Sequence, residues 1–303
     1  MGRCRFHRGL LSVTVIWQGS TDLMQSAPRL LAGILLVNLS LSFPCATLKA
    51  PDSPDSGFLA RSFHSPTGET MPYRLFIPPA YEGDKKYPLV LFLHNALARG
   101  SDNLLQISGT DYAGTHLWTT REAQSKFPAF VLAPQVSDTK AWARPHANTP
   151  PASIRLALEI LDSVETEYAI DVDRLYLVGQ SMGGEGVWMS LAVAPGRFAA
   201  GIALSGYGEP WMIERVAKTP VWAFQGSADD IVPVREAREW IAALRKAGGN
   251  PKYTEYPGLG HQVWDKAFAE PELLPWLAAQ RREAPTAARA LGFLRELPAI
   301  LAQ

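Results

Sequence analysis

The chain has 303 residues, of which 47% are hydrophobic, and it carries 29 Lys plus Arg and 29 Asp plus Glu. This length is enough to bury a large core, so one globular domain with terminal extensions is the simplest expectation. The formal charge is zero and no long block of like charge occurs, which argues against nucleic acid as a partner. Only two cysteines occur, Cys4 and Cys45, so a cysteine-based zinc cluster and thiol chemistry in the body of the chain are excluded.

Residues 1–50 are interpreted as a signal-peptide region. The apolar run Leu30–Phe43 is shorter than the roughly 20 residues that a membrane-spanning helix needs. Met24 lies just before this run and is the expected true start. An uncleaved membrane anchor is one alternative, and a lipoprotein modified at Cys45 is another, disfavoured because the residues before that cysteine are not small. The chain is therefore expected to be exported, to the periplasm or beyond, with no stable membrane span in its mature form.

Residues 51–61 read as a flexible linker, and alternating strand and helix patterns fill residues 62–280. The first pattern is a hairpin of two extended segments around the turn Thr67-Gly68. Continuous apolar runs predict strands that are buried on both faces, at 87–94, 129–135, 174–179, 199–206 and 220–226. Apolar residues at helical spacing predict helices at 151–168, 182–194, 234–247 and 263–280.

This alternation predicts an α/β fold, with a mostly parallel sheet, helices on both faces and an N-terminal antiparallel hairpin. Residues 97–127 are rich in Gly, Ser, Thr and Asp and are expected to form a long loop or a small cap above the sheet. Residues 281–303 are expected to be an extension, either a short amphipathic helix or a frayed tail. Ligands in such folds bind at the carboxyl ends of the strands, so the functional residues are expected there.

The segment LYLVGQSMGGEG, residues 175–186, contains a G-x-S-x-G pattern centred on Ser181. It follows a predicted strand and opens a predicted helix, which is the context in which a sharp turn exposes a serine in strained geometry. The glycines keep neighbouring side chains from colliding in that turn. Ser181 is therefore the candidate nucleophile, and a structural serine in a glycine-rich helix entrance is the alternative.

A serine nucleophile needs a histidine base, which in turn needs a carboxylate to orient it. His261 is the only histidine after Ser181, and Asp229 follows a predicted strand and is preferred to its neighbour Asp230. The order Ser, Asp, His is the order found in hydrolases with this kind of turn. His94 is interpreted as a residue that shapes a loop, not as the base.

Backbone N–H groups should bind the oxyanion of the tetrahedral intermediate. One is expected from Met182, at a helix N-terminus, and the other from the loop after residue 94, with Ala96 as first choice and Asn95 as second. Trp264 and Tyr207 are candidates for the substrate pocket. No pair of histidines has the helical spacing of metal ligands, so no metal and no cofactor are expected.

From about Phe63 to Leu277 the chain resembles the exported α/β-hydrolases of the carboxylesterase, feruloyl esterase, polyhydroxybutyrate depolymerase-like and "predicted peptidase" groups. The segments that carry the resemblance are YPLVLFLH with RGSDN, FVLAPQ, DVDRLYLVGQSMGGEGVW, WAFQGSADDIVPV, KYTEYPGLGHQVWD and PELLPWL. The resemblance implies a catalytic triad of Ser181, Asp229 and His261.

The chain departs from the family pattern at two positions. Asn95 stands where the family usually has Gly, and Gln225 stands where a His often precedes Gly226. The first departure touches the oxyanion loop, and its shape is expected to survive because Asn tolerates positive φ better than other non-glycine residues. The second departure is expected to be harmless.

The expected function is hydrolysis of carboxylic esters through an acyl-enzyme, with a small or oligomeric ester as substrate. A serine peptidase acting on short peptides is one alternative. The other is a non-catalytic binding protein on a hydrolase scaffold, which would gain support if Ser181 and His261 lay beyond hydrogen-bond reach. The oligomeric state is not readable from the sequence.

Overall fold

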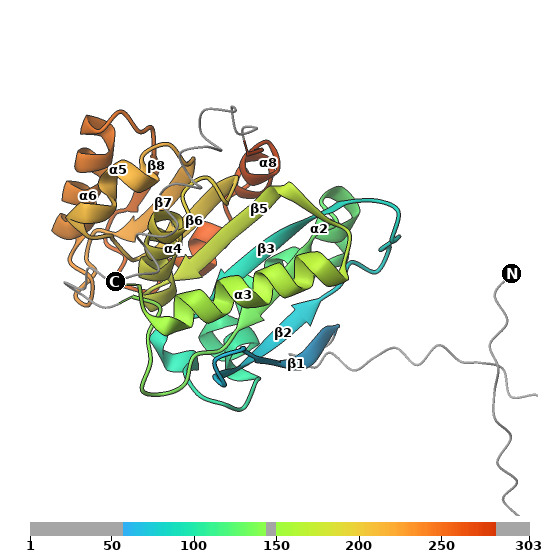
Figure 1. Cartoon of the computed structure of the whole chain (residues 1–303). Helices are drawn as coiled ribbons and strands as arrows, with labels where there is room; N and C mark the ends of the chain where they lie inside the picture. Colours follow the sequence, from blue (N-terminus) through green and yellow to red (C-terminus); the bar gives the residue numbers. More distant parts are fainter. Residues whose placement is uncertain (1–56, 144–149, 283–303) are drawn as a thin grey trace, which may run out of the picture. The chain divides into compact units, whose positions relative to one another are not determined.

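The computed structural model describes residues 57–143 and 150–282, and an eight-stranded sheet lies at its centre (Figure 1). The strands run in the order β1-β2-β4-β3-β5-β6-β7-β8. The β1–β2 and β2–β4 pairs are antiparallel, and every other neighbouring pair is parallel. The predicted α/β fold with an N-terminal hairpin is confirmed. The strands are β1 (Phe58–His64), β2 (Thr70–Phe76), β3 (Tyr87–Leu93), β4 (Phe130–Pro134), β5 (Ile170–Gln180), β6 (Ala200–Leu204), β7 (Val221–Gly226) and β8 (Lys252–Tyr256).

Helices cover both faces of the sheet, and two separate hydrophobic cores lie beneath them. Every residue of β3 is buried, as expected for a strand between two helical layers. One core packs under α3 (Ala152–Glu167), α4 (Met182–Val193), α5 (Ile213–Val216) and α6 (Val234–Lys246). The other packs under α1 (Tyr112–His116), α7 (Trp264–Phe268) and α8 (Leu273–Ala278). The helix α2 (Arg121–Lys126) directly precedes Phe127, which belongs to this core. Figure 1 shows α3 lying across one face of the sheet.

The segment 97–127 is not a cap above the sheet but part of the cover on its second face. Short 3-10 helices, η1 (Ala96–Ala98), η2 (Leu105–Ile107), η3 (Gly109–Asp111) and η4 (Leu117–Thr119), alternate there with α1 and α2. Ile107 is 0% exposed and Trp118 is 1% exposed, and both belong to the second core. The segment as a whole is polar in composition, so the sequence did not indicate that these two residues are buried. A fifth 3-10 helix, η5 (Pro210–Met212), follows β6.

Two predicted boundaries differ from the structure, and one strand was not predicted. β1 begins at Phe58, inside the predicted linker, because the Phe58 ring packs on Phe76 with 5.6 Å between ring centroids. β8 was not predicted as a strand. Its first four residues are only partly buried, so its sequence shows neither a continuous apolar run nor a clear alternation of apolar and polar residues. The predicted helix 263–280 is divided into α7 and α8, and Pro271, which cannot donate a helical hydrogen bond, lies between them.

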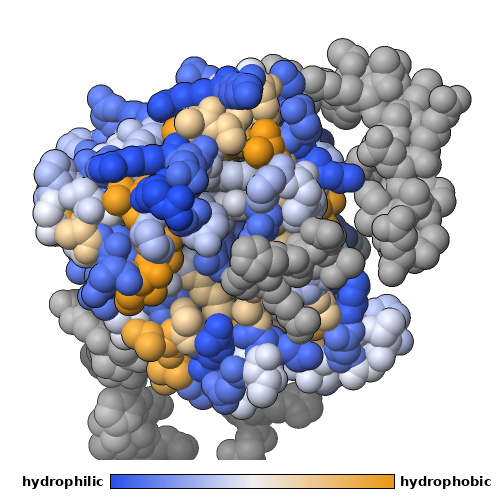
Figure 2. Space-filling view, turned by 90° about the vertical axis from the view of Figure 1, so that its left-hand side faces the viewer, coloured by the Kyte–Doolittle hydropathy of each residue, from blue (hydrophilic) through white to orange (hydrophobic). Residues whose placement is uncertain are grey.

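The predicted signal-peptide region and most of the C-terminal extension, residues 283–303, fall outside the described residues. Within the described ranges, no helix is both long and apolar enough to span a membrane. Figure 2 shows one face of the molecule, where polar side chains separate several small apolar patches.

Candidate active site

Ser181 occupies a tight turn between β5 and α4. Its φ of 56° and ψ of −121° lie in a region that non-glycine residues rarely adopt. Two glycines permit the close packing of this turn. A Cβ on Gly179 would lie 2.1 Å from the carbonyl oxygen of Gly183, and a Cβ on Gly183 would lie 1.8 Å from that of Leu93. The G-x-S-x-G pattern therefore reflects backbone contacts that admit no side chain.

Ser181, His261 and Asp229 form a continuous chain of hydrogen bonds. The His261 Nε2 lies 2.7 Å from the Ser181 Oγ, and its Nδ1 lies 2.9 Å from the Asp229 Oδ2 and 3.1 Å from Oδ1. With Nδ1 protonated and donating to the carboxylate, Nε2 is free to accept the serine proton. The three side chains follow the ends of β5, β7 and β8. The sheet therefore brings together three residues that are far apart in the sequence.

Asp229 is held by three further donors. Its Oδ1 accepts the backbone N–H groups of Ile231, at 3.0 Å, and Val232, at 2.8 Å. Its Oδ2 accepts the Nε2 of Gln225 at 2.7 Å. Gln225 is 1% exposed and also donates to the Val232 carbonyl at 2.9 Å. The departure at Gln225 is therefore part of the machinery that orients the carboxylate, a role that sequence reasoning missed.

The loop that carries His261 is fixed from both sides. Ser205, at the end of β6, donates its hydroxyl to the His261 carbonyl at 2.7 Å and has a strained φ of 48°. Trp264 stands edge-on to the imidazole, with 5.7 Å between ring centroids. Trp264 is 4% exposed and belongs to the second core, so its place is behind the histidine and not in an open pocket. Ser205 directly follows a buried strand, and this position could have indicated from the sequence that it lies near the site.

The first-choice oxyanion donors have free N–H groups. Met182 opens α4 and Ala96 opens η1, and neither N–H has an acceptor within the described ranges. The second choice, Asn95, is wrong for this role because its N–H already donates to the Asp111 Oδ1 at 3.0 Å. The expectation of positive φ is also wrong: Asn95 has φ −74°, and its Oδ1 accepts the N–H of Leu97 at 2.8 Å. The asparagine therefore shapes the loop as a cap, without the conformational freedom of glycine.

His94 is 0% exposed, and within the described ranges its ring makes no hydrogen bond to Ser181. Its Nδ1 lies 2.7 Å from the Asn95 carbonyl, and its Nε2 accepts the N–H of Val136 at 3.0 Å. Burial lowers the pKa of His94 to about 4, which keeps the ring neutral. Trp142 donates to the His94 carbonyl at 3.0 Å. These contacts agree with a loop-shaping residue.

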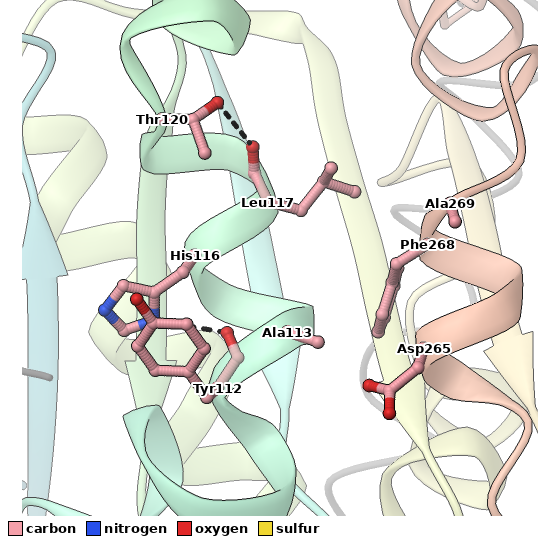
Figure 3. A pocket seen from close by; sticks show the side chains of 8 residues that line it. All are labelled: Tyr112, Ala113, His116, Leu117, Thr120, Asp265, Phe268 and Ala269. Carbon is pink, nitrogen blue, oxygen red and sulfur yellow. Dashed lines mark hydrogen bonds between the residues drawn. The ribbon is translucent and has the colours of Figure 1, made fainter.

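A pocket of about 350 Å³ opens between α1 and α7 (Figure 3). Tyr112 stacks on His116 on one wall, with 3.8 Å between ring centroids, and Asp265 and Phe268 extend from the other. None of the residues in the hydrogen-bonded chain lines this pocket, so it is not the place where the serine meets an ester. Tyr207 is partly buried on the loop after β6, against the first core.

Comparison with known proteins agrees with this geometry. The family model described as "Putative esterase" matches residues 65–252, more than half of the chain. The chain is 23% identical to "Carboxylesterase SOBER1" of Arabidopsis thaliana, over 56% of this chain and 83% of that protein. It is 33% identical to "Acyl-protein thioesterase 1" of Neurospora crassa over a shorter stretch, 33% of this chain and 44% of that protein.

A solved structure described as a thermostable esterase matches with a TM-score of 0.72 and 36% identity. That match covers 75% of this chain and 64% of the other, so the chain spans less than two thirds of that esterase. The family match includes Ser181 and Asp229, while His261 lies just beyond its end. The chain belongs to the "Putative esterase" family and is a serine hydrolase of the α/β-hydrolase fold.

Proposed function

We propose that this chain hydrolyses carboxylic esters through a covalent acyl-enzyme. The Ser181 Oγ attacks the ester carbonyl while the His261 Nε2 accepts the hydroxyl proton. The imidazolium then gives this proton to the leaving alkoxide, which departs as the alcohol. Water, deprotonated by the same Nε2, attacks the acyl group. The acyl–Oγ bond then breaks, the imidazolium returns its proton to the Ser181 Oγ, and the acid is released. Asp229 holds the imidazole in the tautomer that these transfers need.

The oxyanion of each tetrahedral intermediate would be bound by the N–H groups of Ala96 and Met182. The close approach of Gly183 to the Leu93 carbonyl brings the end of β3 against the start of α4, which supports this assignment. Such donors lower the barrier by about 2.7–4 kcal/mol each where they have been tested, because they are aimed at charge that appears only during the reaction.

The observation that carries the proposal is the hydrogen-bonded chain from Ser181 through His261 to Asp229, with links of 2.7 and 2.9 Å. A non-catalytic binding protein would have gained support if Ser181 and His261 lay beyond hydrogen-bond reach. The contact between them removes that argument and supports chemistry at the serine.

Two exposed apolar side chains belong to loops that carry residues of the site. The two most exposed large apolar side chains in the described ranges are Leu97, at 73%, and Ile231, at 68%. Leu97 follows the proposed oxyanion donor Ala96, and Ile231 belongs to the loop that holds Asp229. Apolar side chains on the two loops that carry Ala96 and Asp229 favour esters with hydrocarbon substituents.

The test is release of p-nitrophenol from acetate and butyrate esters. The wild type is expected to turn over with a burst, and Ser181→Ala to fall to the background rate. Ser125→Ala, which removes an exposed hydroxyl on α2, is the matched control and is expected to keep full activity. A folded wild type that did no better than Ser181→Ala on either ester would overturn the proposal.

We also propose that the chain is exported. The support is the apolar run Leu30–Phe43, too short to span a bilayer and typical of a signal peptide. Expression of the full chain followed by cell fractionation and N-terminal sequencing tests this. Export with a new N-terminus near residue 50 is expected, and an uncleaved chain in the cytoplasm would contradict it.

A further inference from the structure

Asp111 joins the two segments that carry the proposed oxyanion donors. Its side chain is 0% exposed, and its Oδ1 accepts the Asn95 N–H at 3.0 Å and the Gln180 Nε2 at 2.7 Å. Asn95 immediately precedes Ala96, and Gln180 immediately precedes the turn that carries Met182. A single carboxyl oxygen therefore ties the loop after β3 to the turn after β5.

Two amide groups beside this carboxyl group also donate to Thr110. The second N–H of the Gln180 carboxamide donates to the Thr110 carbonyl at 2.8 Å, and the Asn95 Nδ2 donates to the Thr110 Oγ1 at 2.7 Å. Two buried acceptors remain without a donor in the described ranges, the Asp111 Oδ2 and the Gln180 Oε1. They belong to the two side chains that already share one hydrogen bond, and buried acceptors without donors are costly.

One proton on the Asp111 Oδ2 would satisfy both acceptors. A carboxylic acid and a carboxamide form a two-bond ring, in which the amide N–H donates to one acid oxygen and the acid O–H donates to the amide oxygen. We propose that Asp111 is such a neutral acid, paired with Gln180, and that it is the positioning residue that holds the Ala96 donor in register with Ser181 and Met182.

The electrostatics of the site support this proposal, which rests on the proposed ester hydrolysis for its catalytic part. Burial raises the pKa of Asp111 well above its usual range, and only the hydrogen bonds from Asn95 and Gln180 oppose this shift. No charged side chain in the described part of the chain contributes to it. A carboxylate at this place would repel the negative charge that develops on the oxyanion, whereas a neutral acid holds the loop without that penalty.

Asparagine distinguishes a neutral acid from a carboxylate. In Asp111→Asn the amide keeps an acceptor for Asn95 and Gln180 and supplies a donor for the Gln180 Oε1. This variant is expected to retain kcat and KM within about threefold, whereas Asp111→Ala and Gln180→Met are expected to lose at least about tenfold in kcat with little change in KM, because oxyanion donors act in the transition state. If Asp111→Asn lost as much as Asp111→Ala, or if both Asp111→Ala and Gln180→Met kept their kcat, the proposal would be wrong.

The protonation state has a readout that is independent of activity. The infrared difference spectrum of wild type minus Asp111→Asn is expected to show the carbonyl band of a protonated carboxylic acid at pH 7, where a carboxyl group with an ordinary pKa is ionised. Glu185, whose pKa is raised to about 7, is present in both proteins, so its band cancels in the difference. Asp138→Asn, which changes an exposed aspartate in the same way, is the control and is expected to show no such band. Absence of the band from the Asp111 difference spectrum would overturn the neutral acid.

The stability of the fold gives a second readout. Because a neutral Asp111 binds a proton that the unfolded chain releases above about pH 4, the stability advantage of Asp111→Asn over the wild type is expected to grow as the pH rises. If the wild type cleaved no ester at all, the proposed function would fail, while the infrared and unfolding results would still decide the state of Asp111.

Discussion

Replacement of Gln225 by leucine tests how the site orients its histidine. The leucine side chain is somewhat larger and can donate neither to the Asp229 Oδ2, which now accepts from Gln225 at 2.7 Å, nor to the Val232 carbonyl, which accepts at 2.9 Å. A hydrogen bond to a charged group contributes about 1.5–3 kcal/mol. Asp229 keeps the N–H groups of Ile231 and Val232 on its other oxygen, so the carboxylate should stay in place but rotate more freely. If most of the lost energy appears in the transition state, kcat/KM should fall about 10- to 100-fold.

The assay is steady-state hydrolysis of p-nitrophenyl butyrate, with the free energy of unfolding measured in urea for each variant. Gln225→His is expected to recover most of the activity, because an imidazole N–H can donate to the same oxygen. Gln124→Leu is the matched control, since Gln124 also donates to two acceptors, the carbonyls of Trp118 and Ala129, but far from the triad. A folded Gln225→Leu with wild-type kcat/KM would refute the reasoning.

Three further predictions follow from single contacts. Burial and the nearby Glu209 raise the pKa of Glu185 from 4.5 to about 7, so the folded state holds this proton more tightly and stability is lost as the pH rises between these values. Urea unfolding should show Glu185→Gln gaining on the wild type by up to about 3 kcal/mol from pH 4.5 to 8, and a constant difference would contradict this. Gly183→Ala would place a Cβ 1.8 Å from the Leu93 carbonyl oxygen, and thermal unfolding should show a loss of about 3 kcal/mol, the upper end of the usual cost of overpacking; an unchanged melting temperature would show that the backbone yields. Ser205→Ala removes a 2.7 Å hydrogen bond to the His261 carbonyl and should lower kcat about two- to tenfold in the ester assay, whereas full activity would mean that the loop is held without it.

The fold and the candidate triad were predictable because their signals are local. Continuous apolar strands, alternating helices and the strict glycines around Ser181 each reflect a short stretch of chain. His261 and Asp229 were found by the chain order and by their positions after predicted strands, and the structure brings them within hydrogen-bond reach of the serine. Their catalytic roles stay predictions until variants are measured.

The supports of the site could not be predicted because they depend on contacts between distant segments. The Asp111–Gln180 pair joins residues 69 positions apart in the sequence, and no pattern in either segment announces it. The departure at Gln225 was expected to be harmless because nothing in the sequence indicates a contact between Gln225 and Asp229. In the structure the Gln225 side chain donates to the Asp229 carboxylate. Asn95 was expected to imitate a glycine, but it caps a short 3-10 helix with ordinary backbone angles.

The most direct test of the central claim is to trap the acyl-enzyme. The protein is mixed with p-nitrophenyl acetate, quenched in acid during the burst and digested, and the peptides are analysed by mass spectrometry. We predict one acetyl group on the peptide that contains Ser181, and none on that peptide in Ser181→Ala. An acetyl group on a different residue, or hydrolysis that proceeds unchanged in Ser181→Ala, would contradict the assignment of Ser181 as the nucleophile.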